Sequence, residues 1–371
     1  MSSQNVVIVG AGPAGLISYN TLAAKAAKAS NFDVILIDPR NFHVHQPSSL
    51  RMLVTDQGAL EKRTLMPHNE ALQNGKNKRV VHDKVVSITD KGTQGGHVTL
   101  ASGETIDYSV LVLSTGSVWS GPLVWADTKE EIIAKAHDWR SKFKTSKNIV
   151  LVGGGAVGFE LAGEIKDIYP NTNVTIVHTQ LLPLNDTYTD SWRKLAKKGA
   201  EKRGINLVLG DAVEDFEIQN GKVTTRNGKS ITTDLVVPTF GSKPNTEIFK
   251  TLGADALNES GFVRVQPTLQ LVNHPRIFAA GDVIEWKEEK QLMKAMAHAP
   301  IIAQNVLAMV NGTNKLKPYK TSMEMIVLTN GKGGGSGFMG AMGGVALGDW
   351  FARMIKSKDL LIDMSKKAYA L

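Results

Sequence analysis

Short apolar runs and helical segments follow one another in a repeated order along the chain. Val6–Val9 is a β-branched run, Ala14–Lys28 is alanine-rich and predicted to be a helix, and Val34–Ile37 is a second apolar run. Short continuous apolar runs are typical of parallel strands buried on both faces. About 140 residues later the order returns as a strand at Asn148–Val152, a helix at Phe159–Ile168 and a strand at Val174–Val177. The pattern predicts an α/β protein built on two strand–helix–strand units.

The first unit carries a glycine loop between its strand and its helix. Gly10, Gly12 and Gly15 form a G-x-G-x-x-G pattern. The first glycine permits a tight turn, the second lets the backbone approach a pyrophosphate, and the third lets helix and strand pack closely. Pro13 suits the first helical turn, where a missing N–H costs no hydrogen bond. The next strand ends at Asp38, roughly 20 residues after the loop, as expected for a carboxylate that binds a ribose. This unit is predicted to bind a dinucleotide.

The second unit repeats the loop with one difference. Gly153, Gly155 and Gly158 have the same spacing, but the following strand ends at His178, where an NAD-selective site usually has an acidic residue. Without a carboxylate nothing repels a 2′-phosphate, so the site is expected to accept both NADH and NADPH. The alternative is that His178 is only a residue at a surface strand end.

Three further strand-and-turn segments fit the same plan. Val110–Leu113 leads into Ser114-Thr115-Gly116, Leu235–Val237 into Thr239-Phe240-Gly241, and Arg276–Ala280 into Gly281-Asp282. Asp282 could accept hydrogen bonds from the ribityl chain of a flavin or be an ordinary turn residue. Both interpretations fit its position.

The C-terminal segment has a different character. Met323–Leu328 is predicted to be a strand, 330–348 is dense in glycine with no function assigned, and Asp349–Lys367 is predicted to be one amphipathic helix. The pairs Trp350/Met354 and Phe351/Ile355 give this helix an apolar face. Three interpretations stay open for that face: packing within the chain, a dimer contact, or contact with a membrane surface.

Composition narrows the class of protein. The 371 residues include 35 glycines and no cysteine, with 42% apolar and 21% charged residues and a net charge of +8. This length predicts two or three domains, and the composition is that of a globular protein. The absence of cysteine excludes disulfides, thiolate metal sites, iron–sulfur clusters and a thiol nucleophile. The positive charge favours anionic partners without identifying one.

The sequence also bears on location. No apolar stretch approaches the ~18 residues of a membrane span. Met1–Asn5 is too short for a signal or transit peptide ahead of the first strand, and Ser2 stands where N-myristoylated proteins have glycine. We therefore expect an intracellular, cytoplasmic protein, either soluble or peripheral on a membrane or lipid surface.

Together these motifs resemble the flavoprotein reductases that have two dinucleotide-binding domains and a glutathione-reductase-like fold. Within that fold the chain is similar to the apoptosis-inducing-factor-like oxidoreductases, particularly those of the ferroptosis-suppressor type, which are NAD(P)H:quinone oxidoreductases. The segments that carry this similarity are Gly153–Gly158, Glu160, Ala162–Lys166, Tyr169–Pro170, Val174–Gln180, Phe42–Arg51 and Ile355–Leu360. The resemblance implies two Rossmann-like domains, one for FAD at 1–118 with 248–311 and one for NAD(P)H at 119–247, and a small α+β domain at 312–371.

The resemblance also implies which residues bind the cofactors. Non-covalent FAD would be held by Gly10, Gly12, Pro13, Ala14, Gly15, Asp38, Arg51, Thr115, Gly116, Gly281, Asp282 and Ala297. NADH or NADPH, as substrate, would be held by Gly153, Gly155, Ala156, Val157, Gly158, Glu160, His178 and Gly241. For Arg51 the alternative is a solvated arginine in a polar loop.

Three residues are implied to act near the flavin. Glu160 would face nicotinamide and flavin, although a carboxylate in the first turn of a helix is also stabilised by the helix dipole alone. His298 would lie beside the isoalloxazine, just ahead of a helix predicted at Pro300–Val310, or be a solvated cap residue. Lys356 matches a lysine near the acceptor side of the flavin, or is a basic surface residue.

The implied reaction is hydride transfer from NAD(P)H to FAD, followed by electron transfer from reduced FAD directly to a quinone, since no Cys-x-x-Cys relay exists. Two alternatives stay open: an NAD(P)H-dependent reductase of a small redox protein, and a DNA-binding cell-death effector with residual NADH oxidase activity. Non-specific DNA binding has little support, because no nucleic-acid motif is present and aromatic residues make up only 6%. A homodimer and membrane contact through the C-terminal helix are further candidates. His43 and His45 have no further ligands nearby in the sequence, so no metal is assigned.

Overall fold

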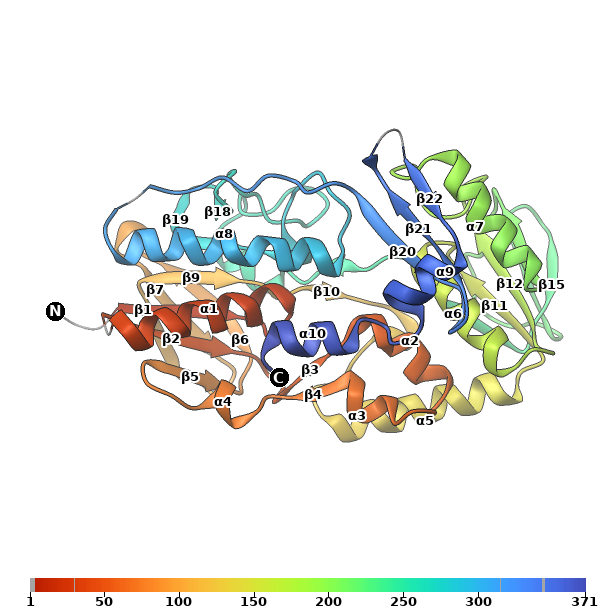
Figure 1. Cartoon of the computed structure of the whole chain (residues 1–371), viewed down its shortest axis with the longest axis horizontal. Coiled ribbons are helices and arrows are strands. Elements are labelled where there is room, and N and C mark those ends of the chain that lie inside the picture. Colours follow the sequence, from red (N-terminus) through yellow and green to blue (C-terminus); the bar gives the residue numbers. More distant parts are fainter. Residues whose placement is uncertain (1–3, 30, 314, 342–343) are drawn as a thin grey trace.

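The structure, a computed structural model, describes residues 4–29, 31–313, 315–341 and 344–371, so Ser2 lies outside the described residues. Two parallel sheets lie toward opposite ends of an elongated molecule (Figure 1). The C-terminal strands lie beside the second sheet, and the last helix lies against the first helix of the chain (Figure 1). The mixed α/β fold with two Rossmann-like units is therefore confirmed.

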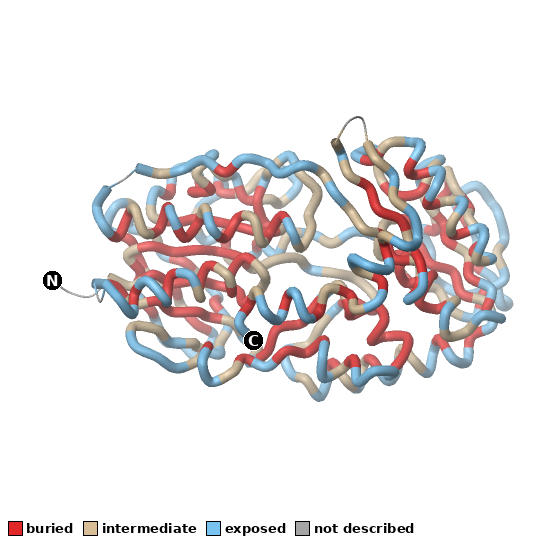
Figure 2. Tube along the Cα trace, in the orientation of Figure 1, coloured by how far each residue is buried: buried red, intermediate tan, exposed pale blue. Residues whose placement is uncertain are grey.

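The first sheet has six strands in the order β18-β19-β9-β1-β2-β5. Its central strand β1 (Gln4–Val9) pairs in parallel with β2 (Phe32–Ile37) and β9 (Val110–Leu113). The outer strands are β5 (Lys78–Val81), β19 (His274–Ala279) and the antiparallel β18 (Gln270–Leu271). Val6, Val7 and Ile8 are fully buried, as expected for a central parallel strand, and Figure 2 shows the sheet as a continuous buried layer. Since β18 and β19 follow the second sheet in sequence, the chain returns to complete the first.

The second sheet has four parallel strands in the order β13-β12-β11-β16. They are β11 (Asn148–Val152), β12 (Asn173–His178), β13 (Ile205–Leu209) and β16 (Leu235–Pro238). Helix α6 (Ala156–Ile168) connects β11 to β12, and α7 (Asp190–Lys202) precedes β13. In the first sheet α1 (Pro13–Ala29) has the place of α6. The two predicted strand–helix–strand units are confirmed, while the domain boundaries stay a prediction.

Smaller elements complete the chain. The helices are α2 (Gln46–Val54), α3 (Leu60–Thr64), α4 (Glu70–Gln73) and α5 (Lys129–Thr145). Antiparallel pairs are β3 (Phe42–Val44) with β4 (Leu65–Pro67), β10 (Ser117–Val118) with β17 (Lys243–Pro244), and β14 (Lys222–Thr224) with β15 (Ser230–Thr232). Antiparallel three-stranded sheets are β6 (Val85–Asp90), β7 (Gly96–Leu100) and β8 (Thr105–Tyr108), and β20 (Met325–Thr329), β21 (Gly335–Met339) and β22 (Val345–Leu347).

One predicted helix begins too late. The helix expected from Pro300 is α8 (Leu292–Val310), so Pro300 lies inside it. The residues before Pro300 are mostly Leu, Met, Lys and Ala, which are strong helix formers, and Pro300 itself is exposed. As a result Ala297 and His298 lie within the helix and not ahead of it.

The C-terminal prediction needs two corrections. The glycine-dense segment contains β21 and β22. The single helix expected at Asp349–Lys367 is divided into α9 (Asp349–Ala352), a π-helical turn (Arg353–Ser357) and α10 (Ile362–Tyr369). Leu360 and Leu361 both have a φ of 62°, a left-handed conformation that ends a right-handed helix. Apolar periodicity alone does not reveal this break.

Candidate active site

In the first glycine loop, two of the three glycines are crowded by protein atoms and one is not. Gly10 has a φ of +100°, and a Cβ there would lie 2.4 Å from the Ser114 carbonyl oxygen. A Cβ on Gly15 would lie 1.9 Å from the Gly10 oxygen. Gly12 differs, because the nearest atom to its Cβ position is 3.9 Å away. Two of the glycines are thus required by packing, while the third leaves the backbone open to a ligand, as pyrophosphate binding requires.

The second loop repeats this division. Gly153 has a φ of +121° and a Cβ position 2.7 Å from the Phe240 nitrogen, and a Cβ on Gly158 would lie 2.0 Å from the Gly153 oxygen. A Cβ on Gly155 would meet nothing within 4 Å. Both loops lead into a helix N-terminus, where free N–H groups and the helix dipole favour a phosphate.

The residues that end the second strand of each unit contact their loops in the same way. The Asp38 carboxylate accepts the backbone N–H groups of Ala11 at 2.7 Å and of Arg40 at 2.9 Å. Burial raises the pKa of Asp38, and these two N–H groups oppose that effect. His178 Nδ1 accepts the N–H of Gly154, the residue that corresponds to Ala11, at 3.2 Å. Its Nε2 contacts the Leu184 carbonyl oxygen at 3.0 Å, so His178 is neutral with the proton on Nε2. Burial lowers the pKa of His178.

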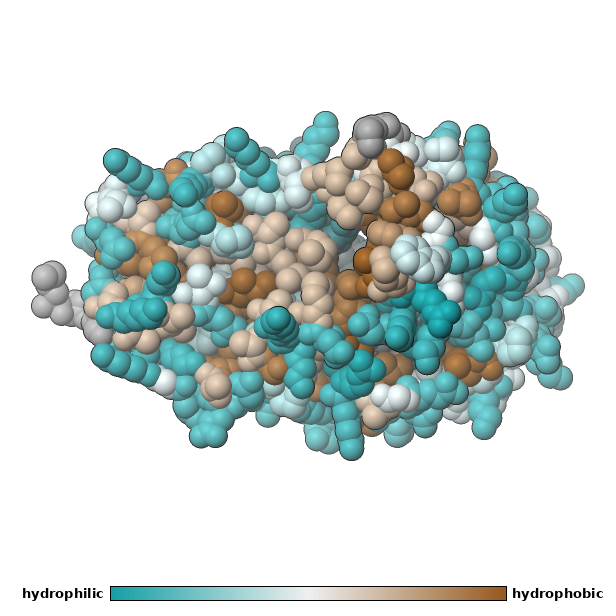
Figure 3. Space-filling view, in the orientation of Figure 1, coloured by the Kyte–Doolittle hydropathy of each residue, from teal (hydrophilic) through white to brown (hydrophobic). Residues whose placement is uncertain are grey.

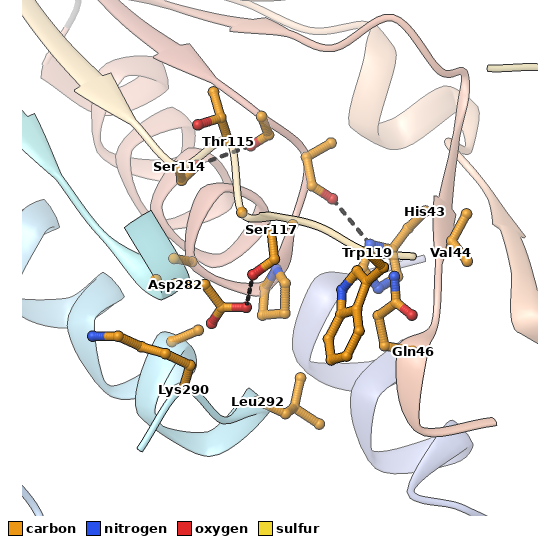
Figure 4. A pocket seen from close by; sticks show the side chains of 18 of the residues that line it. His43, Val44, Gln46, Ser114, Thr115, Ser117, Trp119, Asp282, Lys290 and Leu292 are labelled. Atoms are coloured by element: carbon orange, nitrogen blue, oxygen red, sulfur yellow. Dashed lines mark hydrogen bonds between the residues drawn. The ribbon is translucent and has the colours of Figure 1, made fainter. Parts of the chain in front are cut away.

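The first cavity, of about 330 Å³, opens between the first glycine loop and the start of α8. Its lining includes Gly10, Gly12, Pro13, Ala14, Asp38, Thr115, Gly116, Glu160, Gly281 and Asp282. Figure 4 shows Ser117, Asp282 and Lys290 on one side and His43, Gln46 and Trp119 on the other. The Ser117 hydroxyl donates to Asp282 at 2.6 Å. The strand-end carboxylate and the G-D turn predicted from the sequence therefore meet at one cavity.

The second cavity, of about 530 Å³, lies over the second glycine loop. Its lining includes Gly153, Gly155, Ala156, His178, Tyr188, Asp211, Phe240, Gly241 and Ile326. Val157 lines the first cavity instead, which places the start of α6 at the junction of the two. Lys290 and Gln291 line both cavities, so the two spaces share a wall.

An ion pair joins the second unit to the C-terminal segment beside the first cavity. Glu160 lies on α6, and its Oε1 contacts Lys356 Nζ at 2.6 Å. The same oxygen accepts the backbone N–H of Thr329 at 2.9 Å, and Lys356 also donates to the Val327 carbonyl at 3.2 Å. Both side chains are largely buried. The pair thus links α6, β20 and the π-helical turn.

The sequence matches the family model for pyridine nucleotide-disulphide oxidoreductases over residues 4–300. The chain belongs to this family. A fungal relative, the FAD-dependent oxidoreductase FVFD30 of Flammulina velutipes, is 44% identical over 319 residues, which cover 85% of this chain and 98% of the relative. Ferroptosis suppressor protein 1 of Homo sapiens is 29% identical over 372 residues, which cover 98% of this chain and 95% of the relative.

A solved structure with the same fold is the sulfide:quinone oxidoreductase of Aquifex aeolicus, with a TM-score of 0.77, 16% identity, and coverage of 99% of this chain and 92% of that one. Membership of the pyridine nucleotide-disulphide oxidoreductase family, together with these relatives, gives FAD as the cofactor and NAD(P)H as the nucleotide substrate. The residues present fit both groups, since each loop has an uncrowded glycine facing a cavity at a helix N-terminus.

His298 is buried and does not line the first cavity, so its predicted place beside the isoalloxazine stays a prediction. It lies in α8, where its Nδ1 accepts the Gly281 N–H at 3.0 Å and its Nε2 contacts Glu288 Oε1 at 2.8 Å. The Tyr319 hydroxyl donates to the other Glu288 oxygen at 2.8 Å. Burial raises the pKa of Glu288, but these hydrogen bonds outweigh it and hold the pKa below its usual range. His298 therefore supports the G-D turn from behind. Ala297, one residue earlier, is also outside the cavity lining.

Arg51 also lies elsewhere. It is neither a solvated loop residue nor part of the first cavity, because it is buried on α2 and its guanidinium is paired with Glu164 on α6. The segment that ends at Arg51 is not a polar loop but a strand, β3, followed by this helix. Glu164, the partner of Arg51, gave no signal in the sequence as a site residue.

Several cavity residues were missed by sequence reasoning. These are His43, Gln46 and Trp119 in the first cavity, Tyr188 and Asp211 in the second, and Lys290 and Gln291 in both. Most lie on loops between elements, where no motif marks them. In the sequence, His43 was considered only together with His45, as a possible pair of metal ligands. Within the described ranges no group of three or more His, Asp or Glu side chains gathers as a metal would need.

Proposed function

We propose that this protein is an FAD-dependent NAD(P)H:quinone oxidoreductase that passes electrons from reduced FAD directly to a quinone. The observation that carries the proposal is the contact of Lys356 with Glu160, which lines the first cavity while Lys356 lies behind it, in a chain with no cysteine to relay electrons. Disulfides are reduced through attack by a thiolate, and this chain has no thiol to supply one. A small acceptor that reaches the flavin itself is therefore the simplest match to this site.

The two cavities divide the binding work. In the first, the Gly10–Gly15 loop and the N-terminus of α1 would hold the FAD pyrophosphate, Asp38 the ribose, and Asp282 the ribityl chain. In the second, the Gly153–Gly158 loop would hold NAD(P)H beside His178. When bound, FAD supplies hydride acceptance and electron transfer, while the chain supplies orientation and electrostatics.

Lys356 and Glu160 would act at the reacting end. A lysine ammonium has three N–H donors. In the described part of the chain, Glu160 and Val327 account for two of them. The third is free to donate to a quinone oxygen, where it would stabilise the negative charge that develops on reduction. Glu160 in turn holds Lys356 in place through their contact, and would position the nicotinamide carboxamide.

A direct test starts from the visible spectrum of the purified protein. We expect flavin bands that NADH or NADPH bleaches and a short-chain quinone restores. Lys356→Ala should lower kcat/KM for the quinone by about tenfold or more, given typical losses for a group that stabilises developing charge. Lys358→Ala is a matched control, since Lys358 is exposed two residues away and should behave as the unchanged protein. Quinone reduction that is equal in both variants would refute the role of Lys356.

Contact with a lipid surface is part of the proposal, because a hydrophobic quinone must reach the site. Trp350 and Met354 on the C-terminal segment are 75% and 54% exposed, and Figure 3 shows apolar groups gathered over the C-terminal strands beside a hollow. No helix among the described residues is both long and apolar enough to cross a membrane. Peripheral contact would be supported if the protein sediments with anionic vesicles and a smaller fraction of the Trp350→Ser variant does so.

Other partners and a location are also predicted for this protein. A small redox protein as acceptor, non-specific DNA binding, a homodimer and a cytoplasmic location are each compatible with a net charge of +8. Competition between a quinone and a small acidic redox protein in the same assay would separate the first from the quinone reductase.

A further inference from the structure

Two ion pairs extend from α6, one helical turn apart, to α2 and to the π-helical turn. Glu160 and Glu164 are four residues apart on α6, a spacing that places them on one face of the helix. Glu160 contacts Lys356, and Glu164 contacts Arg51, which in turn contacts the carbonyl of Ser357, next to Lys356. Arg51 and Glu164 thus lie behind the pair that we place at the reacting end.

Arg51 makes four hydrogen bonds from an almost fully buried position. Its Nε donates to Glu164 Oε2 at 2.7 Å and its Nη2 to Glu164 Oε1 at 2.9 Å, which is a two-point contact. Nη2 also donates to the Ser357 carbonyl at 2.7 Å, and Nη1 to the Lys358 carbonyl at 3.4 Å. The side chains of Arg51 and Glu164 are 8% and 4% exposed. Only a guanidinium has the fixed fork of donors that reaches all of these oxygens together.

The carbonyls that Arg51 holds belong to an unusual turn. Arg353–Ser357 is π-helical, a geometry that is rare and often found at functional sites. The last carbonyls of a helix lack partners within the helix, and Arg51 supplies donors to them. Arg51 lies on α2, whose neighbouring residue Leu50 lines the first cavity. One side chain therefore connects the wall of that cavity with α6 and with the turn that carries Lys356.

We propose that Arg51 and Glu164 are positioning residues that fix Lys356 Nζ beside Glu160. The proposal rests on the function proposed above only where it concerns turnover; the placement of Lys356 can be tested without it. A lysine stem is long and flexible, so the position of its ammonium depends on the main chain from which it extends. Arg51 fixes that main chain at Ser357 and fixes α6 at Glu164. It therefore sets both partners of the Glu160–Lys356 pair.

The test measures how readily Lys356 reacts. The FAD-loaded protein is treated with an amine-reactive ester, and labelling of Lys356 is followed by mass spectrometry. In Arg51→Gln, Lys356 should label about tenfold faster than in the unchanged protein, because a loosened buried ion pair exposes the amine. Lys294, which is buried with its own carbonyl partners at Ser322 and Met323, should label equally in both proteins. Equal labelling of Lys356 would overturn the proposal.

Arg140→Gln is the matched control. Arg140 is a largely buried arginine that contacts the same helix through the Met52 carbonyl at 2.7 Å and pairs with Glu61. Among the described residues none of its hydrogen bonds reaches α6 or the turn. This variant should leave labelling of Lys356 unchanged. Should Arg51→Gln fail to fold, the double variant Arg51→Met with Glu164→Leu removes both charges together, a replacement that buried ion pairs often tolerate. It should fold and still label Lys356 faster.

Turnover gives the second measurement. Arg51→Gln should lower kcat for the quinone by up to about 100-fold, the loss that a misplacement of 1 Å can cause, with FAD still bound. The same change made in Lys356→Ala should have less than about a twofold further effect, since coupled residues are not additive. Fully additive losses would mean a merely structural role. If Lys356→Ala itself leaves quinone reduction unchanged, the proposed function fails, while the labelling result still decides the positioning role.

Discussion

His178 Nδ1 accepts the backbone N–H of Gly154 at 3.2 Å, in the place where Asp38 accepts the N–H of Ala11 in the first loop. The glycine at position 154 and the histidine at position 178 depend on each other, because a Cβ at position 154 would lie 2.8 Å from the His178 ring carbon Cγ. A glycine in the loop thus makes room for a ring at the strand end. The result is a strand end with the same hydrogen bond and no negative charge.

Cofactor selectivity should follow from this missing charge. In His178→Asp, a carboxylate beside the 2′-phosphate should lower kcat/KM for NADPH relative to NADH by about tenfold or more through charge repulsion. His178→Gln, which keeps a neutral acceptor, should leave the ratio within about twofold. Steady-state kinetics with both nucleotides measure this. A ratio unchanged in the aspartate variant would return His178 to a purely structural role.

Glu160 should matter for the nicotinamide nucleotide and not for FAD. Its replacement by alanine leaves Lys356 and the Thr329 N–H without their acceptor, so we expect KM for NAD(P)H to rise by about 10- to 100-fold, as for other losses of orientation. The ratio of flavin to protein absorbance should stay the same. Unaltered kinetics would show that Glu160 serves only to hold β20 against α6.

Retention of FAD should depend on His298 without direct contact. His298→Ala removes the acceptor of the Gly281 N–H, and a buried group left unsatisfied costs about 1–3 kcal/mol. We expect the Kd for FAD to rise by about 5- to 100-fold, which fluorescence titration of the flavin-free protein would measure. Tyr319→Phe, which removes only the outer hydrogen bond to Glu288, should give a smaller rise. Stability that falls with no change in Kd would contradict this prediction.

Acid should loosen the C-terminal helix. His45 contacts Ser365 of α10 at 3.0 Å, and His43 packs edge-on against Tyr369. Burial lowers the pKa of His43 to about 4 and that of His45 to about 3. Because these folded-state values lie below the unfolded value of about 6.5, the unfolded chain binds more protons in between.

Stability should therefore be full above about pH 6.5 and fall as the pH drops toward 4, by about 2 kcal/mol for each histidine at pH 5. Urea midpoints at pH 7 and pH 5 measure the loss, and His45→Gln should reduce it. His137→Gln, at a largely exposed histidine, should not. A loss of equal size in all three proteins would rule out the buried histidines as its cause.

The parts of the fold that sequence reasoning predicted are those set by neighbouring residues. Gly15 and Gly158 are required by the carbonyl oxygens of Gly10 and Gly153, five residues earlier in the same loops, so the spacing of these glycines alone indicated the loops. Pro300 and the leucines at 360 and 361 show the limit of this reasoning. At Pro300 helix propensity outweighs a local stop signal, and at the two leucines the backbone conformation breaks a regular apolar pattern.

The candidate site was predictable only in part. Glu160 and Lys356 are 196 positions apart, and nothing in either segment indicates that they meet; family resemblance alone joined them. Arg51 and His298 were singled out by the same resemblance, but their partners Glu164 and Glu288 lie on elements whose packing no local pattern encodes. A role that depends on long-range contacts needs the structure.

The two cavities meet at Lys290 and Gln291, which line both of them. A nucleotide entering one space necessarily alters the surroundings of whatever fills the other. The visible absorption spectrum of the flavin should therefore change when the nucleotide binds, before any electron is transferred. Attempts to alter nucleotide preference in this chain are better made around His178, which lines the second cavity and not the first, so that the surroundings of the flavin are left unchanged.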